Sequence, residues 1–560
     1  MRALRATATG RVEVSSLASE PLTRARAWAA AWWREAIPFA ALAGLALALR
    51  FLQLDEKPYH HDESIHAWFS WRLSSGDGYS YDPVYHGPVQ FLLIGLSQFL
   101  LGAGDFVSRI PPALMGTIAV FLPFFVRKQL GTVAALTASL ALCLGPSYLY
   151  FSRFAREDIY VACVTLGLIV VAIRYFDRPR FWQPSVFFGL LAVAFATKET
   201  TYITVFVFGL FAIGAIVVQT VSSRRAGRHW LDGTLLGSAV SLGRDAWAWA
   251  AATFLVVFTL LFSTFLTNPR GLQDGLWGSI DYWLGQQDVG RGGSRWFFYL
   301  VLMPAYEWPI VLLGALGIVV ALRRRTMTDL FLVWTFACSL AVYSWASERM
   351  PWLILHPLLP LVLLGGIGAQ ALWDARARLA ARLAFAVVGL AAVGALYSSI
   401  QLSYFRSADP RELLVQVQSS DDVPRIRDEF VRLQNLMTRQ SGEQVVFQVD
   451  SWGGTGWPWS WYLRDQPLGY YDMSNPEQVP RAAPALLVAD PNHLAMAPFY
   501  EDYEKRRFRL RVWWVPDWGA ASPLDWARWA LTREPWSPTA TMDEWLYLGP
   551  DVPRRTGADE

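Results

Sequence analysis

Apolar runs of membrane-spanning length alternate with short polar loops over most of the first 402 residues. A helix needs about 20 apolar residues to cross the hydrocarbon core of a bilayer. The pattern predicts about eleven such helices, and therefore an α-helical polytopic membrane protein. The runs lie at residues 37–54, 110–126, 132–151, 159–176, 181–197, 202–221, 246–266, 303–322, 330–345, 353–373 and 383–402.

A further apolar run, residues 88–101, is short for a span and begins directly after Gly87. The basic loops decide how it lies, because Lys and Arg gather on the cytoplasmic side of membrane proteins. If this run does not cross, the N-terminal tail and every basic loop share one side, so we predict a helix that lies in the outer interface. The basic loops hold Arg127 and Lys128; Arg174, Arg178 and Arg180; Arg224, Arg225, Arg228 and Arg244; Arg323, Arg324 and Arg325; and Arg376, Arg378 and Arg382.

This topology divides the chain into three parts. We expect a cytoplasmic tail at residues 1–35, a transmembrane domain at 36–402 and an extracytoplasmic mixed α/β domain at 403–560, in a multi-pass protein of the cell (plasma) membrane. The transmembrane domain has a large first outer loop at 55–108. Residues 267–295, rich in Gly and aromatic side chains, predict a mobile loop.

The C-terminal part is amphipathic rather than membranous. Residues 445–449 and 485–489 predict strands, and the charge pattern around 423–437 predicts a helix. Inverted repeats and interrupted spans are typical of secondary transporters, and the sequence predicts neither.

Composition agrees with the membrane class, since 54% of the residues are hydrophobic and the mean hydropathy is +0.26. The net charge of +3 gives no reason to expect a nucleic-acid partner. The three cysteines, Cys143, Cys163 and Cys338, fall inside apolar runs and form no disulfide or metal-binding pattern. No phosphate-binding glycine motif on the inner side indicates ATP or a dinucleotide.

Two adjacent carboxylates, Asp62 and Glu63, follow the first predicted span. Neighbouring carboxylates repel each other and raise one pKa unless cations share them, so the pair suits a general base or a cation site. A solvated turn is the structural alternative. The three nearby histidines, His60, His61 and His66, leave a divalent metal at Asp62/Glu63 open, but no metal site is predicted.

Several other ionisable side chains fall on the same predicted side. His86 enters the interface where a phosphate headgroup would lie, although it would also serve as a helix cap. Outer loops are normally poor in Arg, so Arg153 and Arg156 in the second loop indicate an anionic ligand or pairing with carboxylates. The remaining side chains are Arg109, Glu157, Asp158, Lys198, Glu199, Glu348, Arg349 and His356.

Ionisable residues at membrane depth are costly and usually functional, so their common side is informative, although each alone could be an interfacial anchor. Cations hold a lipid phosphate while its chain stays in the bilayer. Carboxylates accept a proton from an incoming hydroxyl, and cations stabilise the departing phosphate. The collection therefore predicts transfer of a sugar from a lipid phosphosugar.

These motifs resemble the GT-C class of membrane glycosyltransferases, in particular the protein O-mannosyltransferases and the aminoarabinose transferases of lipid A. The resemblance covers residues 36–402 and rests on Asp62-Glu63, His86-Gly87-Pro88, Arg109-Ile110-Pro111, Arg153 with Arg156 and Asp158, and Lys198-Glu199. A GT-C-related group, the flippase-activity-associated proteins of glycosylation pathways, is more similar still. That resemblance adds Glu348-Arg349-Met350-Pro351-Trp352, His356-Pro357, Asp409-Pro410-Arg411-Glu412 and residues 457–465.

The resemblance implies a glycosyltransferase with a polyprenyl-phosphate sugar donor and an extracytoplasmic lipid, glycan or protein acceptor. Asp62 is then the catalytic base, with Glu63 and Asp158 as its catalytic partners. Arg109, Arg153, Arg156 and Lys198 hold the phosphate or buttress the carboxylates, and the other implied substrate-binding residues are His61, His86, Glu199, Glu348, Arg349 and His356.

Two alternatives stay open. The same pocket would suit a non-catalytic factor that binds or flips lipid-linked saccharides. His86 stands where the aminoarabinose enzymes have Lys, which makes phosphate contact there dependent on pH. Three tryptophans of the C-terminal part, Trp457, Trp459 and Trp461, would stack on sugar rings or form a core seam.

Overall fold

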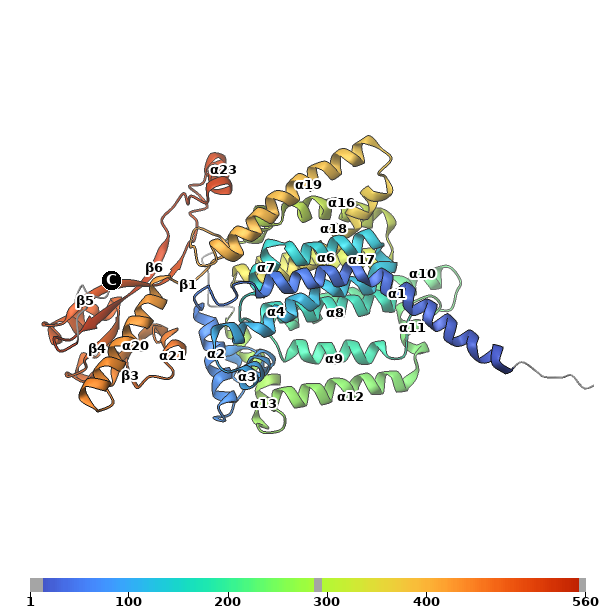
Figure 1. The fold of residues 1–560 in the computed structure, drawn as a ribbon. Coiled ribbons are helices and arrows are strands. Elements are labelled where there is room, and N and C mark those ends of the chain that lie inside the picture. The colour runs from blue at the N-terminus through green and yellow to red at the C-terminus, as the bar shows by residue number, and fades with distance from the viewer. Residues whose placement is uncertain (1–13, 287–294, 553–560) are drawn as a thin grey trace, which may run out of the picture.

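The computed structural model describes residues 14–286 and 295–552. Long helices run side by side in one bundle, and the C-terminal domain sits at one end of it (Figure 1). Helix α1 (Val14–Phe51) leaves the bundle at the opposite end (Figure 1). Most of the predicted tail therefore continues the first helix, while residues 1–13 lie outside the described residues.

Within the described residues, seven helical segments are long and apolar enough to cross a membrane. Each of the predicted spans falls on a helix, so the predicted fold class is confirmed. The seven are α8 (Asp158–Asp177), α10 (Thr201–Arg225), α12 (Gly243–Phe262), α17 (Met327–Trp345), α4 (Asp105–Phe121) continued to Leu130, α18 (Leu355–Asp374) preceded by the turn η4 (Pro351–Ile354), and α19 (Leu379–Ile400) continued to Phe405. The run at 181–197 gives the shorter α9 (Gln183–Phe195), and α11 (Leu235–Ser241) precedes α12.

Two predicted spans are interrupted, so the expectation of unbroken spans is wrong. Helices α6 (Thr132–Leu144) and α7 (Pro146–Ser152) meet at 53°, and α15 (Phe298–Tyr306) and α16 (Trp308–Arg324) meet at 111°. A proline stands in the first turn of both α7 and α16, where it lacks a backbone donor to continue the preceding helix. Glu307 joins the two breaks, because its Oε1 accepts a hydrogen bond from the backbone N–H of Ser147 at 2.8 Å.

The first outer loop is largely helical. It contains α2 (His61–Ser74) and α3 (Pro88–Leu101), so the predicted short helix at 88–101 is confirmed, and both lie at the end of the bundle nearest the C-terminal domain (Figure 1). The predicted mobile loop at 267–295 instead forms α13 (Arg270–Gln273), η3 (Asp274–Gly278) and α14 (Ser279–Gln286). Residues 287–294 of that loop lie outside the described residues.

The C-terminal domain is built on a six-stranded sheet with the order β1-β5-β6-β4-β2-β3. Strand β2 is parallel to β3 and β4, and the other pairs are antiparallel. Both predicted strands and the predicted helix are confirmed, as β2, β4 and α20. The elements are β1 (Gln418–Ser419), α20 (Asp422–Ser441), β2 (Phe447–Asp450), α21 (Trp459–Tyr462), β3 (Leu468–Tyr471), β4 (Ala485–Ala489), α22 (His493–Met496), β5 (Glu504–Trp513), α23 (Pro523–Thr532) and β6 (Ala540–Leu548).

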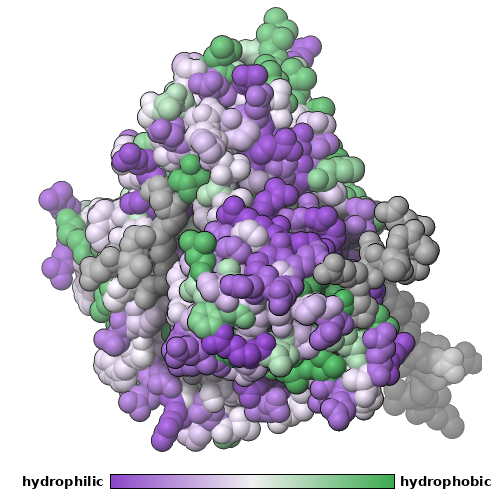
Figure 2. Space-filling view, turned by 90° about the vertical axis from the view of Figure 1, so that its left-hand side faces the viewer, coloured by the Kyte–Doolittle hydropathy of each residue, from purple (hydrophilic) through white to green (hydrophobic). Residues whose placement is uncertain are grey.

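Aromatic side chains pack the C-terminal domain against the first outer loop. The Tyr59 ring stacks on Trp461 with 5.5 Å between ring centroids, and the Tyr59 backbone N–H donates to the Tyr462 hydroxyl at 2.8 Å. The Trp461 indole donates to Asp105 at 2.9 Å. Trp459 and Trp461 are fully buried, so they are core residues rather than sugar platforms. Figure 2 shows the opposite, outward face of the domain as mostly hydrophilic.

Candidate functional site

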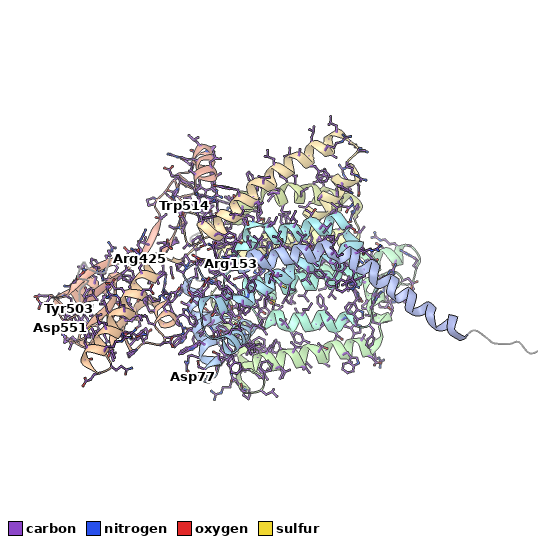
Figure 3. The ribbon with its side chains drawn as sticks, in the orientation of Figure 1. Asp77, Arg153, Arg425, Tyr503, Trp514 and Asp551 are labelled. Atoms are coloured by element: carbon purple, nitrogen blue, oxygen red, sulfur yellow. The ribbon has the colours of Figure 1, made fainter. Side chains whose placement is uncertain are left out.

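Most of the predicted ionisable side chains lie at the end of the bundle that faces the C-terminal domain, where Figure 3 labels Arg153. They come from α2, from the turn before α3, from the turns before α8 and α10, and from α18. Two groups form there, one around Glu63 and the other around Glu157.

Glu63 is fully buried and fully paired. Arg109 Nε and Nη2 donate to its two oxygens at 2.8 and 2.9 Å, and the backbone N–H groups of His60 and Ala155 donate at 3.0 and 2.8 Å. Burial raises the pKa of Glu63, but Arg109 and Lys57 outweigh burial and hold it far below the ordinary value. Glu63 also completes a capping box with His60 at the start of α2. These contacts give Glu63 a structural role, in which it holds the start of α2 in place.

Arg109 is equally occupied. Besides Glu63, its guanidinium donates to the backbone carbonyls of Leu54, Lys57 and Pro58 at 3.0, 2.8 and 3.4 Å. A guanidinium has five N–H donors, and these contacts engage all of them. Of the two roles the resemblance allows, the structure favours the buttress of a carboxylate.

Arg153 lies against the end of α1 rather than beside the acidic pair. Its guanidinium donates to the carbonyls of Leu49, Arg50 and Gln53 at 3.0, 3.0 and 2.7 Å, and its centre lies 4.6 Å from the Tyr404 ring centroid. The last carbonyls of a helix lack intrahelical partners, so a cation there satisfies them and the helix dipole. The structure therefore does not bring Arg153 to Asp62 and Glu63 as expected.

The second group surrounds the buried carboxylate of Glu157. Lys198 Nζ and Arg156 Nη2 donate to Oε1 at 2.6 and 3.1 Å. His86 Nε2 lies 3.5 Å from Oε1, and His66 Nε2 lies 3.8 Å from Oε2. Burial raises the pKa of Glu157, but these four groups outweigh it and hold the pKa well below the ordinary value. Glu157 is thus an ionised centre that organises cations.

Asp158 shares the same cations from the first turn of α8. Lys198 Nζ donates to its Oδ1 at 2.8 Å, and Arg156 Nε lies 3.5 Å from Oδ2. His356 Nε2 stands 3.6 Å from Oδ1, and the His356 ring stacks on Tyr343 with 5.0 Å between centroids. Predicted residues from three separate segments therefore meet here.

Asp62 keeps contact with solvent, with 28% of its side chain exposed. Arg156 Nη1 donates to it, and the same guanidinium donates to Glu157. The guanidinium carbon lies over Trp352, 3.8 Å from the ring centroid, which helps to fix its position. Asp62 is thereby linked through one arginine to the buried group. We call Asp62, Arg156, Glu157, Asp158 and Lys198 the Glu157 cluster.

Two histidines flank Asp62. The Asp62 backbone N–H donates to His60 Nδ1 at 3.0 Å, and His60 Nε2 lies 2.7 Å from the Gln416 carbonyl, so the ring is neutral with its proton on Nε2. Burial accordingly lowers the pKa of His60 and of His61 well below the ordinary value. The predicted ligand His61 faces Gly454 of the C-terminal domain.

A cavity of about 90 Å³ opens beside the Glu157 cluster. Its lining mixes charged and aromatic side chains, as a phosphate joined to an apolar chain would require. His86 Nδ1 lies 2.6 Å from Glu199 Oε2 at its edge. The residues that line the cavity include His86, Lys198, Glu199, Glu348, Tyr343, Tyr282 and Trp283. Arg349 donates from Nε to the Ser344 carbonyl at 3.0 Å.

Asp62 and Glu63 do not offer two free carboxylates to one ion, because Glu63 faces Arg109 and Asp62 faces Arg156. Across residues 14–286 and 295–552, no group of three or more His, Cys, Asp or Glu side chains could hold a metal ion. The open metal alternative at Asp62/Glu63 gains no support from this geometry.

Sequence reasoning missed the central role of Glu157, although its place in an Arg-rich outer loop beside Asp158 was a usable signal. It also missed the aromatic lining from Tyr343, Tyr282 and Trp283. Tyr343 lies in an ordinary apolar span, and the other two lie in a stretch expected to be irregular. The sequence around these three residues gave no indication that they line a cavity.

Known proteins share parts of this sequence and this fold. The family described as dolichyl-phosphate-mannose-protein mannosyltransferase matches residues 85–240. Comparison with curated proteins finds no match. Among solved structures, the chain is similar to ArnT from Cupriavidus metallidurans bound to undecaprenyl phosphate, with 16% identity, a TM-score of 0.54, and coverage of 84% of this chain and 95% of that chain.

A second similar structure is the archaeal oligosaccharyltransferase AglB from Archaeoglobus fulgidus, in complex with an inhibitory peptide and a dolichol-phosphate. Identity is 10%, the TM-score is 0.56, and the match covers 84% of this chain and 72% of that chain. The chain therefore has the fold of the GT-C membrane glycosyltransferases, and the predicted relationship is confirmed at that level. Its assignment to the flippase-associated group stays a prediction.

The buried Glu63–Arg109 pair predicts a large effect on stability. Replacement of Arg109 by Met leaves the Glu63 carboxylate buried without its main partner, which costs about 3–5 kcal/mol. The matched control is Arg425→Met, because Arg425 is 76% exposed in its pair with Asp422 and such pairs contribute about 0–1 kcal/mol. Thermal unfolding of both variants in detergent, followed by tryptophan fluorescence, checks this. Equal melting temperatures for the two variants would contradict the supporting role.

Proposed function

We propose that the protein is a glycosyltransferase that moves a sugar from a polyprenyl-phosphate donor to an extracytoplasmic lipid, glycan or protein. The observation that carries the proposal is the Glu157 cluster: a solvent-accessible carboxylate, Asp62, linked by Arg156 to buried charges beside a half-apolar cavity. The neighbouring fold adds support, since ArnT and AglB were solved with polyprenyl phosphates.

The reaction needs one base and one anion site. Asp62 accepts the proton of the acceptor hydroxyl while the hydroxyl oxygen bonds to the anomeric carbon. The bond between that carbon and the donor phosphate oxygen breaks, so the configuration inverts and polyprenyl phosphate leaves. Lys198, His86 and Arg156 stabilise the charge that develops on the phosphate. Asp158 and Glu157 hold those cations in place.

Orientation in the membrane belongs to the same proposal. The basic loops face the cytoplasm, and the Glu157 cluster and the C-terminal domain lie outside the plasma membrane. The basic loops on the predicted inner side support this arrangement. A donor presented outside the cell needs no soluble nucleotide, which fits the lack of a nucleotide motif in the sequence.

A non-catalytic factor that binds or flips lipid-linked saccharides is the rival proposal, and the two interrupted helix pairs are the observation that favours it. The α6/α7 break, however, lies near one end of the bundle. Helix α7 has seven residues, or about 10 Å of rise, between the break and Arg153. A break near the surface suits an outer active site better than a path through the midplane.

Replacement of Asp62 by Asn tests the base directly. We expect kcat for sugar transfer from a polyprenyl-phosphate sugar to fall by about 10²–10⁴, the usual contribution of a general base. Donor binding should change little, because the phosphate ligands remain. Asp77→Asn is the matched control, since Asp77 lies on the first outer loop away from the Glu157 cluster (Figure 3).

Two outcomes would contradict this proposal. Full transfer by the Asp62→Asn variant would remove Asp62 as the base. No transfer by the wild type, with glycan export intact in both proteins, would favour the flipping factor.

His86 makes donor binding sensitive to pH. Burial lowers the pKa of His86, but the carboxylates of Glu157 and Glu199 outweigh burial and raise it above the ordinary 6.5. The imidazole is therefore charged below the raised pKa and loses its charge as pH rises through that value. A phosphodiester donor keeps its single charge over this window, so donor KM should rise with pH above 6.5. In the His86→Lys variant, donor KM should no longer rise with pH. If donor KM rises with pH in that variant as it does in the wild type, another group is responsible.

A further inference from the structure

Helix α23 of the C-terminal domain carries an exposed apolar stripe. Leu524 and Leu531 stand seven residues apart, on the same face of the helix, and are 76% and 85% exposed. Ala527 and Ala530 are also exposed and extend the stripe to one side. Arg528, on the other side, pairs with Glu534 at 2.9 Å. A helix with one apolar and one charged side is typical of a membrane interface.

A groove of about 530 Å³ runs between α23 and α15. Helix α23 forms one wall of the groove with Trp526, Trp529 and its two alanines. Helix α15 forms the other wall with Leu300, Val301 and Pro304, and Trp518 also lines the groove. Its lining carries no charged side chain. The α15/α16 pair bends by 111°, so α15 does not continue the direction of its partner helix. Tryptophans gather at membrane–water interfaces, where one end of the ring is apolar and the other wet.

Buried polar contacts fix α23 to the bundle. Arg533, at its C-terminal end, contacts Glu412 with Nε at 3.1 Å from both oxygens, and Tyr306 of α15 donates to the same carboxylate at 2.6 Å. Arg533 Nη2 also donates to Ser398 of α19 at 3.4 Å. Figures 1 and 3 show α23 and the nearby Trp514 beside the end of α19. The helix therefore stands at the level where two membrane helices end.

The surface next to α23 identifies what covers the stripe. Helix α19 is one of the membrane-spanning helices, and its outward side chains Leu390, Val393 and Phe405 are exposed. These side chains face lipid in the membrane. The stripe and groove of α23 continue that apolar surface beyond the end of α19. We therefore expect the bilayer to contact both surfaces.

We propose that α23 is a membrane-interface helix, and that its stripe and groove bind the acyl chains of phospholipids in the leaflet next to the C-terminal domain. This contact holds the domain against the bilayer, above the Glu157 cluster. It is independent of the proposed reaction, because no residue of α23 belongs to that cluster.

Fluorescence quenching by brominated lipids tests this in the full chain. A bimane label at Leu524→Cys or Leu531→Cys, in a Cys338→Ser background, is placed in nanodiscs with one chain per disc. Lipids brominated near the carbonyl should quench both labels about as strongly as one at Phe405→Cys, at the end of the membrane segment that contains α19. A label at Asp551→Cys, at the far tip of the domain (Figure 3), should keep its emission.

Two results would overturn the proposal. Labels at 524 and 531 that keep their emission like the label at 551 would place the stripe in water. If the labels at 524 and 531 are shielded from water without being quenched by brominated lipid, and only when a disc holds two chains, the stripe contacts a second copy of this chain. All four positions are exposed, so substitution there leaves the core intact.

Discussion

A single buried carboxylate, Glu157, organises the outer end of the bundle. An ionised group without solvent needs cationic partners, and Glu157 receives them from a turn, from the start of α10 and from the loop before α3. Lys198 and His86 are distant from Glu157 in sequence, so their contacts with its carboxylate help to hold these segments together. Two of these cationic groups, Lys198 and His86, also line the adjoining cavity.

The adjacent carboxylates of Asp62 and Glu63 show how burial assigns roles. Glu63 points inward, is fully paired by Arg109 and two backbone N–H groups, and fixes the start of α2. Asp62, one residue earlier, points to solvent and has Arg156 as its partner. Neighbours along a helix point in different directions, so one acid is buried at the start of α2 and the other reaches solvent. Arg153 follows the same logic, since it caps α1 and leaves Arg156 to the site.

Hydropathy and the positive-inside rule predicted each span, the short helix α3 and the two strands β2 and β4, because these features depend on local pattern. The breaks at Gly145 and Glu307 were missed because each apolar run extends across its break, although Pro146 and Pro309 stand just after them. Helix α14 was missed because it packs against the first outer loop, a contact that no local pattern predicts. The candidate site residues were chosen because the sequence predicts one common side of the membrane for them. The sequence did not show which of these side chains are buried and which reach solvent, because that depends on the direction in which each side chain points.

Binding of undecaprenyl phosphate to the full chain in nanodiscs, followed by cryo-electron microscopy, tests the central claim most directly. The account predicts phosphate density in the cavity beside Glu157, within hydrogen-bonding distance of Lys198 or His86, with Asp62 still exposed to solvent. Phosphate density at another place in the bundle, with Lys198 still held only by Glu157 and Asp158, would contradict it.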